Sequence, residues 1–464
     1  MINISYISTL LLFIININIS IESKTYKFEL FPSAPLTETE YIVTSSDFLS
    51  KLKKRLPLLK TCLGSPKQCF YFALDTNLHM TLLQQKGITP EVFNQTFNIH
   101  ESSSYKEETQ GFPFIYLFKK VSSAFSKDTV TLDPVSYSIG GDFDNIHLND
   151  FPFAIINEEL QVPSLELGGY IGLMRDYHME SYDELNENYS LAYYLAKQKE
   201  LTHKSFMLNY HVSRLGIING GVFVVGVNYK EDSKYKACSS NIHQNRNDLS
   251  WHCYMNNFKL GNTDIPFETK VSFFSAYPLV SLPKSPGRQI FDMMREKSNK
   301  QCHIFSQKSC LYFVCDTEYD LNNFDNIDIC FENDNCFSFT PIYMFTRIFQ
   351  DINGKYFNLF KVIVHLSDDM NVILGYPAFI NNDIVFDYDR QEVGMVSNVI
   401  HKKITKNENI EDIMNKEFKK KMYYVFICLI SLISILGCAM LVYAMDNSSK
   451  EEGFELDVSQ IVLD

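Results

Sequence analysis

The chain has 464 residues, of which 45% are hydrophobic and 14% aromatic, and a formal net charge of −13. It is long enough for two lobes or domains with a large buried core, and its composition excludes a disordered protein. The negative charge and the absence of a nucleic-acid-binding motif argue against a nucleic acid as partner.

The N-terminus predicts export from the cytosol. Residues 1–20 are apolar from Tyr6 to Ile19, as in a secretory signal peptide, although no basic residue precedes the apolar run. An uncleaved membrane anchor is the alternative. Residues 21–59 form an N-terminal lead that ends in the basic amphipathic stretch 47–59, which is typical of a solvated helix running into the first strand.

The first stretch that carries chemistry is 64–83, GSPKQCFYFALDTNLHMTLL. Turn residues at its start are followed by the apolar run 70–74, which predicts a short buried strand. This strand leads to Asp75, Thr76 and Asn77. A carboxylate at the end of a buried strand is costly unless other groups hold it. Asp75 is therefore either a candidate catalytic residue or an ordinary strand-end aspartate in a turn.

The same stretch resembles the first active-site strand of pepsin-like aspartic proteases (peptidase A1). There, Gly-Thr-Pro-x-Gln and an apolar strand lead to Asp-Thr-Gly. The resemblance implies that Asp75 is catalytic with Thr76 beside it, and that the lead 21–59 is a remnant of a pro-segment. Asn77 stands where the family has Gly, which lets the backbone approach the carboxylate closely.

A predicted hairpin follows and resembles the flap of the same family. The segment 97–107, FNIHESSSYKE, is similar to the family's Ser-rich segment before the flap, and the alternating stretch 112–132 predicts a hairpin. Tyr116 lies 12 residues before Asp128, as the flap tyrosine of the family does before its Asp-Thr-Val strand. We expect Tyr116 to lie on a flap whose tip has no glycine. An ordinary strand tyrosine is the alternative.

The second half of the chain matches the family but lacks its second acid. The segment 271–286, VSFFSAYPLVSLPKSP, contains a stretch similar to the family's Ser-Leu-x-x-Leu-Pro. Counting back from it places Phe274 where the second catalytic Asp belongs, followed by Ser275 and Ala276 in place of Ser-Gly. Residues 269–291 contain no Asp or Glu, so the second carboxylate is predicted to be absent.

The resemblance covers about residues 60–398. Further matching segments, in the family's order, are 167–173, 205–226 and 371–396. It implies an all-β fold, mainly strands with short helices, in the bilobal arrangement of the pepsin-like acid proteases. We place the N-terminal lobe at 60–214 and the C-terminal lobe at 215–398.

Nine cysteines precede residue 399, so at least one is free or pairs between chains. With the signal peptide, this cysteine content indicates an oxidising compartment. A zinc site is the alternative, but no histidine spacing fits a zinc motif, and we expect neither a metal nor another cofactor. The disulfide candidates are three pairs that flank a turn or an insertion and two further residues: Cys62 with Cys69, Cys238 with Cys253, Cys330 with Cys336, and Cys302 and Cys310.

The C-terminal region predicts a membrane anchor. Residues 422–445 contain no charged residue and are long enough to cross a bilayer as a helix. With the signal peptide, this predicts a single-pass type I protein of the secretory pathway, whose body is lumenal or extracellular. Lys419, Lys420 and Lys421 would then lie on the outside, against the positive-inside tendency. A juxtamembrane stalk at 399–421 precedes the helix, and an acidic cytosolic tail follows at 446–464.

This topology makes Asn94 and Asn188 candidate glycosylation sites. The function follows from the missing acid, because aspartic-protease hydrolysis needs two carboxylates that share a proton. The preferred hypothesis is a membrane-anchored pseudoprotease that binds a peptide or protein between the lobes. One alternative is an active aspartic endopeptidase that takes its second acid from elsewhere. The other is a structural surface protein with a vestigial cleft.

Overall fold

The structure is a computed structural model, which describes residues 25–32, 56–87, 95–116, 119–134, 136–137, 145–156, 168–175, 189–212, 218–229, 232, 234–240, 250–307, 309–332, 335–350 and 355–397. All of them belong to one compact unit, Met1–His401. The predicted signal peptide, transmembrane helix and acidic tail lie outside the described residues. None of the described helices has the length and apolar character that a membrane span requires.

The described part of the chain is mostly β-structure, and its larger sheet has 14 strands. The strand order is β12-β24-β23-β10-β11-β1-β2-β3-β9-β4-β8-β6-β5, with β7 beside β1. The strands are β1 (Tyr26–Pro32), β2 (Pro57–Leu63), β3 (Gln68–Asp75), β4 (Thr81–Gln84), β5 (Lys106–Tyr116), β6 (Lys119–Leu132), β7 (Ser136–Tyr137), β8 (Ile146–Ile156), β9 (Gly169–Gly172), β10 (Ser205–Val212), β11 (Ile218–Val225), β12 (Tyr235–Ser239), β23 (Asn382–Asp387) and β24 (Glu392–Ser397).

The second sheet has 10 strands, in the order β16-β17-β21-β15-β22-β14-β13-β18-β19, with β20 beside β21. Its strands are β13 (His252–Leu260), β14 (Thr263–Phe274), β15 (Val280–Leu282), β16 (Cys302–Gln307), β17 (Cys310–Asp316), β18 (Ile327–Phe331), β19 (Cys336–Phe339), β20 (Phe345–Gln350), β21 (Lys355–His365) and β22 (Val372–Gly375). The described helices are short: α3 (Leu191–Gln198), α4 (Lys284–Lys297), α5 (Pro341–Met344), and the 3-10 turns η2 (Ile99–Glu101), η4 (Leu321–Asn323) and η6 (Tyr376–Phe379).

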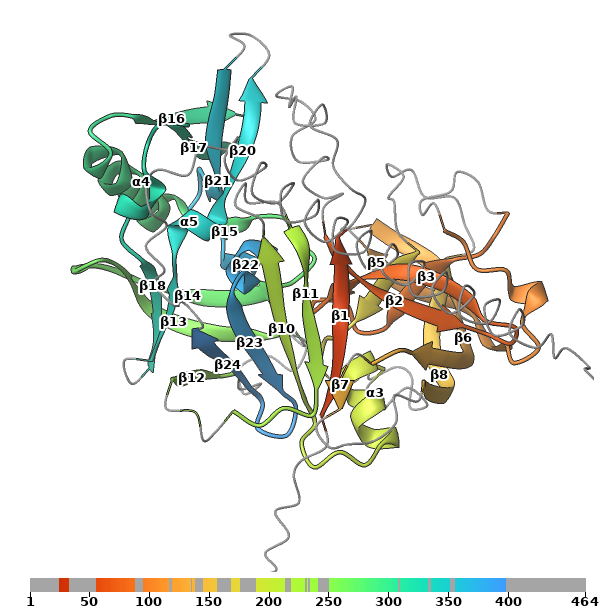
Figure 1. Cartoon of the computed structure of the whole chain (residues 1–464). Coiled ribbons are helices and arrows are strands. Elements are labelled where there is room, and N and C mark those ends of the chain that lie inside the picture. The colour runs from red at the N-terminus through yellow and green to blue at the C-terminus, as the bar shows by residue number, and fades with distance from the viewer. Residues whose placement is uncertain are drawn as a thin grey trace, which may run out of the picture. The chain divides into compact units, whose positions relative to one another are not determined.

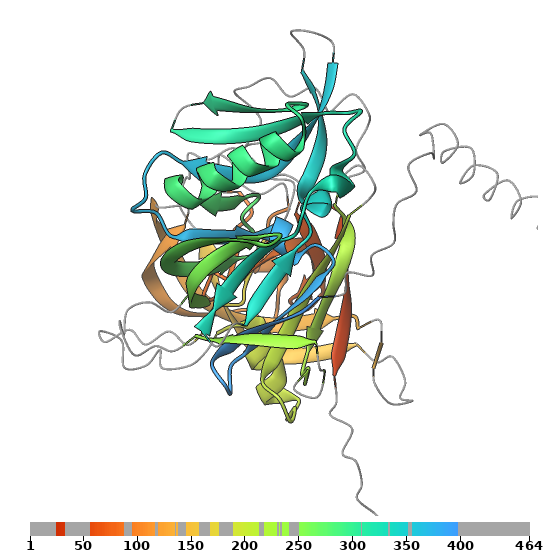
Figure 2. The same cartoon turned by 90° about the vertical axis from the view of Figure 1, so that its left-hand side faces the viewer.

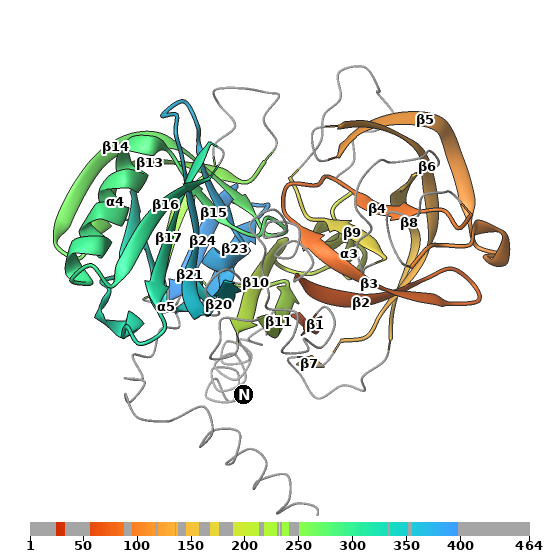
Figure 3. The same cartoon turned by 90° about the horizontal axis from the view of Figure 1, so that it is seen from above.

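Strands β10, β11 and β1 form the middle of the larger sheet and lie side by side (Figure 1). Figure 3 shows them between the 10-stranded sheet and the strands β2 to β9. Because β10 and β11 pair with each other, the predicted lobe boundary at 214/215 falls in the connection of a hairpin. Strand β1 pairs with both β2 and β11 and buries Phe28 and Leu30. The lead 21–59 thus contributes a strand to the main sheet.

Helix α4 is amphipathic. Its buried residues include Gly287, Ile290, Phe291 and Met294, which recur at the spacing of one helix face. This face packs on β16 and β21 of the second sheet (Figure 2). The opposite face is solvated, and there Arg288 pairs with Asp292 one turn later at 2.9 Å.

A cluster of aromatic side chains joins the two sheets. Trp251 directly precedes β13 of the second sheet and is fully buried. Its ring centroid lies 5.2 Å from that of Phe386 on β23, which stacks on Phe206 of β10 at 4.7 Å. The Trp251 indole N–H also donates to the carbonyl of Leu173, next to β9 (2.8 Å). One continuous core therefore runs beneath the ends of β3 and β14.

The two sheets repeat the same strand arrangement. In the larger sheet β3 is parallel to β9, β9 is antiparallel to β4, and β4 is parallel to β8. In the second sheet β14 is parallel to β22, β22 is antiparallel to β15, and β15 is parallel to β21. This repeat means that the end of β3 and the end of β14 occupy equivalent places.

Candidate functional site

Asp75 is the last residue of β3, the strand predicted from the apolar run 70–74. Its carboxylate accepts the backbone N–H of Asn77 at 2.9 Å. Burial raises the pKa of Asp75 from 3.8 to about 6, and this hydrogen bond opposes the rise. A carboxyl group with such a pKa changes its protonation state in weakly acidic solution.

The residues after Asp75 and Phe274 connect the two sheets by reciprocal hydrogen bonds. The Thr76 hydroxyl donates to the carbonyl of Phe273, and the Ser275 hydroxyl donates to the carbonyl of Leu74, both at 2.6 Å. Each hydroxyl also accepts the backbone N–H of the other residue at 3.0 Å. Both side chains are fully buried. The loops after β3 and β14 are therefore held against each other by four hydrogen bonds.

The pairing of the strands places Phe274 at the position equivalent to Asp75. Asp75 is registered opposite Gly172 of β9, and Phe274 is registered opposite Gly375 of β22. Both pairings are parallel, and each of these pairs is the last one before the strand ends. Phe274 is half-buried. Neither cause of the Asp75 pKa shift is another carboxylate.

The two glycines confirm that the loops are equivalent. A Cβ at Gly172 would collide with the backbone of the loop 78–80, and one at Gly375 would collide with the backbone of the loop 277–279. Each loop begins three residues after the last residue of its strand. Only glycine permits so close an approach of strand and loop backbones.

Tyr210, on β10, lies beneath both loops and was not singled out by the sequence. It is 1% exposed. Burial raises its pKa, a hydrogen bond with Ser275 opposes the rise, and the charge of Asp75 adds to it. The phenol is therefore next to both residues. No local pattern could identify Tyr210, because its position depends on the pairing of β10 with β11 and β23 in the middle of the larger sheet.

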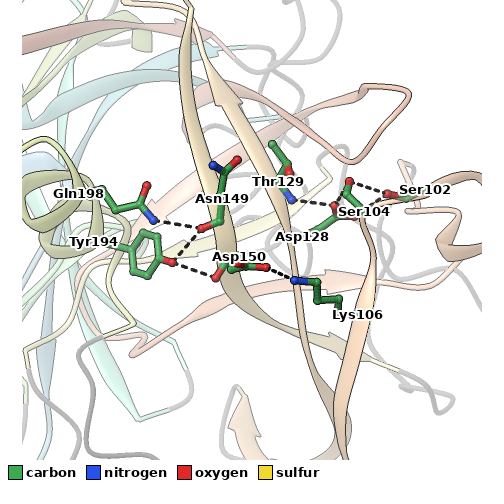
Figure 4. Close-up of polar contacts among 9 residues, drawn as sticks. All are labelled: Ser102, Ser104, Lys106, Asp128, Thr129, Asn149, Asp150, Tyr194 and Gln198. Atoms are coloured by element: carbon green, nitrogen blue, oxygen red, sulfur yellow. Dashed lines mark hydrogen bonds and ion pairs between the residues drawn. The ribbon is translucent and has the colours of Figure 1, made fainter.

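Asp128 on β6 is 1% exposed and holds the segment before the predicted flap hairpin (Figure 4). Its carboxylate accepts the hydroxyls of Ser102 and Ser104 at 2.8 and 2.5 Å and the backbone N–H of Thr129 at 2.7 Å. Three donors satisfy this buried carboxylate. Asp128 therefore has a structural role: its hydrogen bonds hold the Ser-rich segment 97–107 against β6.

The predicted hairpin is present as β5 and β6, which pair antiparallel up to Tyr116 opposite Lys119. Tyr116 thus lies at the end of β5, next to the tip. Its side chain, like residues 117–118, lies outside the described part of the chain. The glycosylation candidates Asn94 and Asn188 also lie outside it.

The described part of the chain contains four disulfides, and three of them are pairs suggested by the sequence: Cys62–Cys69, Cys238–Cys253 and Cys330–Cys336. The fourth, Cys302–Cys315, corrects the prediction, because Cys310 is free. In the β16–β17 hairpin Cys302 is registered directly opposite Cys315, whereas Cys310 faces Gln307. Within the described residues there is no cluster of His, Cys, Asp or Glu that could hold a metal ion.

Comparison with known proteins agrees with this geometry. A family model described as eukaryotic aspartyl protease matches residues 59–398, a range that contains every described strand from β3 to β24 and both strand-end loops. A search of curated proteins found no match. The chain belongs to the eukaryotic aspartyl protease family.

Proposed function

We propose that this protein is a membrane-anchored pseudoprotease, which binds a peptide or protein ligand between its lobes and does not hydrolyse it. The anchor in this proposal is the apolar segment 422–445, and the folded body lies on the lumenal or extracellular side. The observation that carries the proposal is the place of Phe274. It stands at the end of β14 where the strand pairing puts the equivalent of Asp75.

The chemistry supports the loss of hydrolysis. In an aspartic protease one carboxylate acts as base on a water molecule and the other, which holds the shared proton, acts as acid on the peptide carbonyl. A phenylalanine ring at one of the two positions can neither take nor give a proton. Each general acid or base contributes roughly 10²–10⁴-fold to a rate. Removal of one also removes the arrangement that holds the attacking water, so no turnover is expected.

The remaining groups suit ligand binding. Protonated Asp75 can donate a hydrogen bond to a peptide carbonyl, and ionised Asp75 can accept one from a peptide N–H. Since its pKa is about 6, both forms are present in weakly acidic compartments. The half-buried ring of Phe274 provides apolar surface beside it.

One alternative, an active endopeptidase, draws support from the Asp75 pKa of about 6 and from the neighbouring Tyr210 phenol. Burial raises the pKa of that phenol, so it is a poor acid, and its fixed position under the loops favours a structural role. The other alternative is a structural surface protein in which the site has no ligand.

The full-length protein, purified in detergent, separates these functions. Incubation with a peptide library between pH 3 and 6 is expected to yield no cleavage that pepstatin inhibits. Turnover by the wild-type protein that Asp75→Asn abolishes would contradict the proposal and support the active endopeptidase.

Binding is tested with the same library in a pull-down, which is expected to enrich a set of extended peptides. Phe274→Ala should weaken their binding about tenfold or more, because the lost ring removes roughly 1.5–3 kcal/mol of apolar burial. Phe305→Ala is the matched control, since this ring on β16 is 39% exposed and lies on another strand. The absence of any enriched peptide would favour the structural surface protein.

A further inference from the structure

Cys310 is a thiol in a domain whose other described cysteines are all paired. The eight partners of the four disulfides account for every cysteine of the described chain except this one. It lies at the start of β17 and is half-buried. A free thiol is unusual in an oxidising compartment, because such compartments convert neighbouring thiols to disulfides.

The thiol has a base beside it, and that base is oriented by a third group. Cys310 is registered opposite His365 of β21, and its Sγ lies 3.7 Å from the imidazole Nδ1. The other ring nitrogen, Nε2, lies 2.6 Å from the hydroxyl of Ser281 on β15, a fully buried residue. When Nε2 carries the proton and donates to Ser281, Nδ1 is left as an acceptor for the thiol proton. Nucleophile, base and orienting group are thus supplied by three neighbouring strands.

The surroundings keep this pair neutral at rest but accessible. Burial raises the pKa of Cys310 and lowers the pKa of His365, so the resting state is a thiol beside an uncharged imidazole. The titratable neighbours of the thiol are Tyr277 and Tyr312. Cys310 and His365 are each half-buried, so part of each side chain is exposed to solvent.

We propose that Cys310 and His365 form a thiol–imidazole pair that exchanges with low-molecular-weight disulfides. The Cys310 sulfur attacks one sulfur of the incoming disulfide as Nδ1 of His365 takes the thiol proton. The incoming S–S bond breaks, a mixed disulfide forms on Cys310, and the departing thiolate receives the proton from the imidazolium. One disulfide replaces another, so no further oxidant is needed. This site lies outside the pair of strand-end positions and does not depend on the proposed function.

Glutathione disulfide is the test reagent, and the full-length protein is used. Mass spectrometry of the digested protein is expected to find glutathione on Cys310 in the wild type. The rate of this modification should be about tenfold or more lower in His365→Gln, because the base is lost. Ser281→Ala, which removes only the group that orients the imidazole, should also lower the rate of modification, but by a smaller factor. His303→Gln is the matched control, an exposed histidine on β16, and should leave the rate unchanged.

Alkylation by iodoacetamide distinguishes a base from a merely structural histidine. The wild type should react faster than His365→Gln near neutral pH, and the two rates should converge as the pH rises and the thiol ionises without help. Circular dichroism must show that both variants are folded; if His365→Gln is not, Ser281→Ala carries the comparison. Equal rates in wild type and folded variants at neutral pH, or modification of Cys310 only after denaturation, would overturn the proposal.

Discussion

Thr76 and Ser275 lie 199 residues apart in the chain, and each hydroxyl accepts the backbone N–H of the other residue at 3.0 Å. The exchange locks the ends of β3 and β14 together. Because Asp75 and Phe274 each come one residue before a member of this pair, their relative positions are fixed by the same bonds. If Phe274 takes the place of the second acid, as we propose, these bonds hold that position in the absence of the acid.

The first prediction concerns these bonds. Ser275→Ala removes one hydroxyl and leaves the buried Thr76 N–H and the carbonyl of Leu74 without their partner. Each orphaned group costs about 1–3 kcal/mol, so the variant should lose about 2–5 kcal/mol of unfolding free energy. Urea denaturation followed by tryptophan fluorescence measures the loss, since Trp251 lies in the core that joins the sheets.

Ser306→Ala is the control for this variant, because Ser306 is exposed on β16 and its loss should cost under about 0.5 kcal/mol. Equal stability of the two variants would show that the reciprocal bonds do not hold the loops together.

The second prediction concerns pH and Asp75. Burial raises the folded-state pKa from 3.8 to about 6, so the folded protein binds this proton more tightly than the unfolded chain does. The contribution of Asp75 to the unfolding free energy therefore falls as the pH rises from about 4 to about 6, by about 3 kcal/mol in total. Asp75→Asn resembles the protonated form, so it should match the wild type near pH 4 and be more stable at pH 7.

Thermal midpoints of wild type and Asp75→Asn, measured across this range, test the sign and the size of the effect. The exposed Asp133 gives the control, and Asp133→Asn should follow the wild-type pH profile. Parallel profiles for wild type and Asp75→Asn would mean that burial does not raise the pKa of Asp75.

Much of the site could be predicted from the sequence because its elements are local. The apolar run 70–74 between turn residues is enough to predict β3. The similarity of residues 279–283 to the family's motif leads to the expectation that Phe274, at the end of β14, takes the second acid position. The sequence alone does not predict strand β1. Its buried positions, Phe28 and Leu30, alternate over only seven residues, and pairing with β2 and β11 makes it part of the sheet.

The free cysteine could not be predicted, because disulfide choice depends on cross-strand register. Cys302, Cys310 and Cys315 lie within one hairpin, and a different turn position would have placed other residues opposite each other. The contacts of Tyr210 and of the Cys310–His365 pair likewise arise from strands far apart in the chain. Contacts between distant strands produce no characteristic residue spacing from which they could be predicted.

The third prediction concerns topology. If the body is lumenal, Asn94 and Asn188 should carry N-glycans, and the tail after residue 445 should face the cytosol. Treatment with peptide-N-glycosidase should increase gel mobility, and Asn94→Gln and Asn188→Gln should each remove one step of the shift. In sealed right-side-out vesicles, the tail should resist added protease. A glycan on Asn447 instead would show the opposite orientation.

The last prediction restores the missing acid. Phe274→Asp adds a carboxylate at the end of β14, in the register position equivalent to that of Asp75. Two neighbouring like charges raise the pKa of one of the two carboxyl groups, as a shared proton requires. Full peptidase activity should still not return. The Asn77 N–H already reaches Asp75 at 2.9 Å, but Ala276 stands where the family has glycine, and we expect its Cβ to keep the backbone from approaching the new carboxylate in the same way. The triple variant Asn77→Gly, Phe274→Asp, Ala276→Gly should cleave peptides about 100-fold faster than Phe274→Asp, because one backbone hydrogen-bond donor changes a rate by about this factor.

Pepstatin-sensitive peptide cleavage at pH 3 to 6 measures both variants, and Phe274→Asn, which lacks the charge, is the matched control. Activity in Phe274→Asp alone that equals the activity of the triple variant would show that the second carboxylate is the sole deficiency; activity in Phe274→Asn would show that cleavage does not use the pair at all.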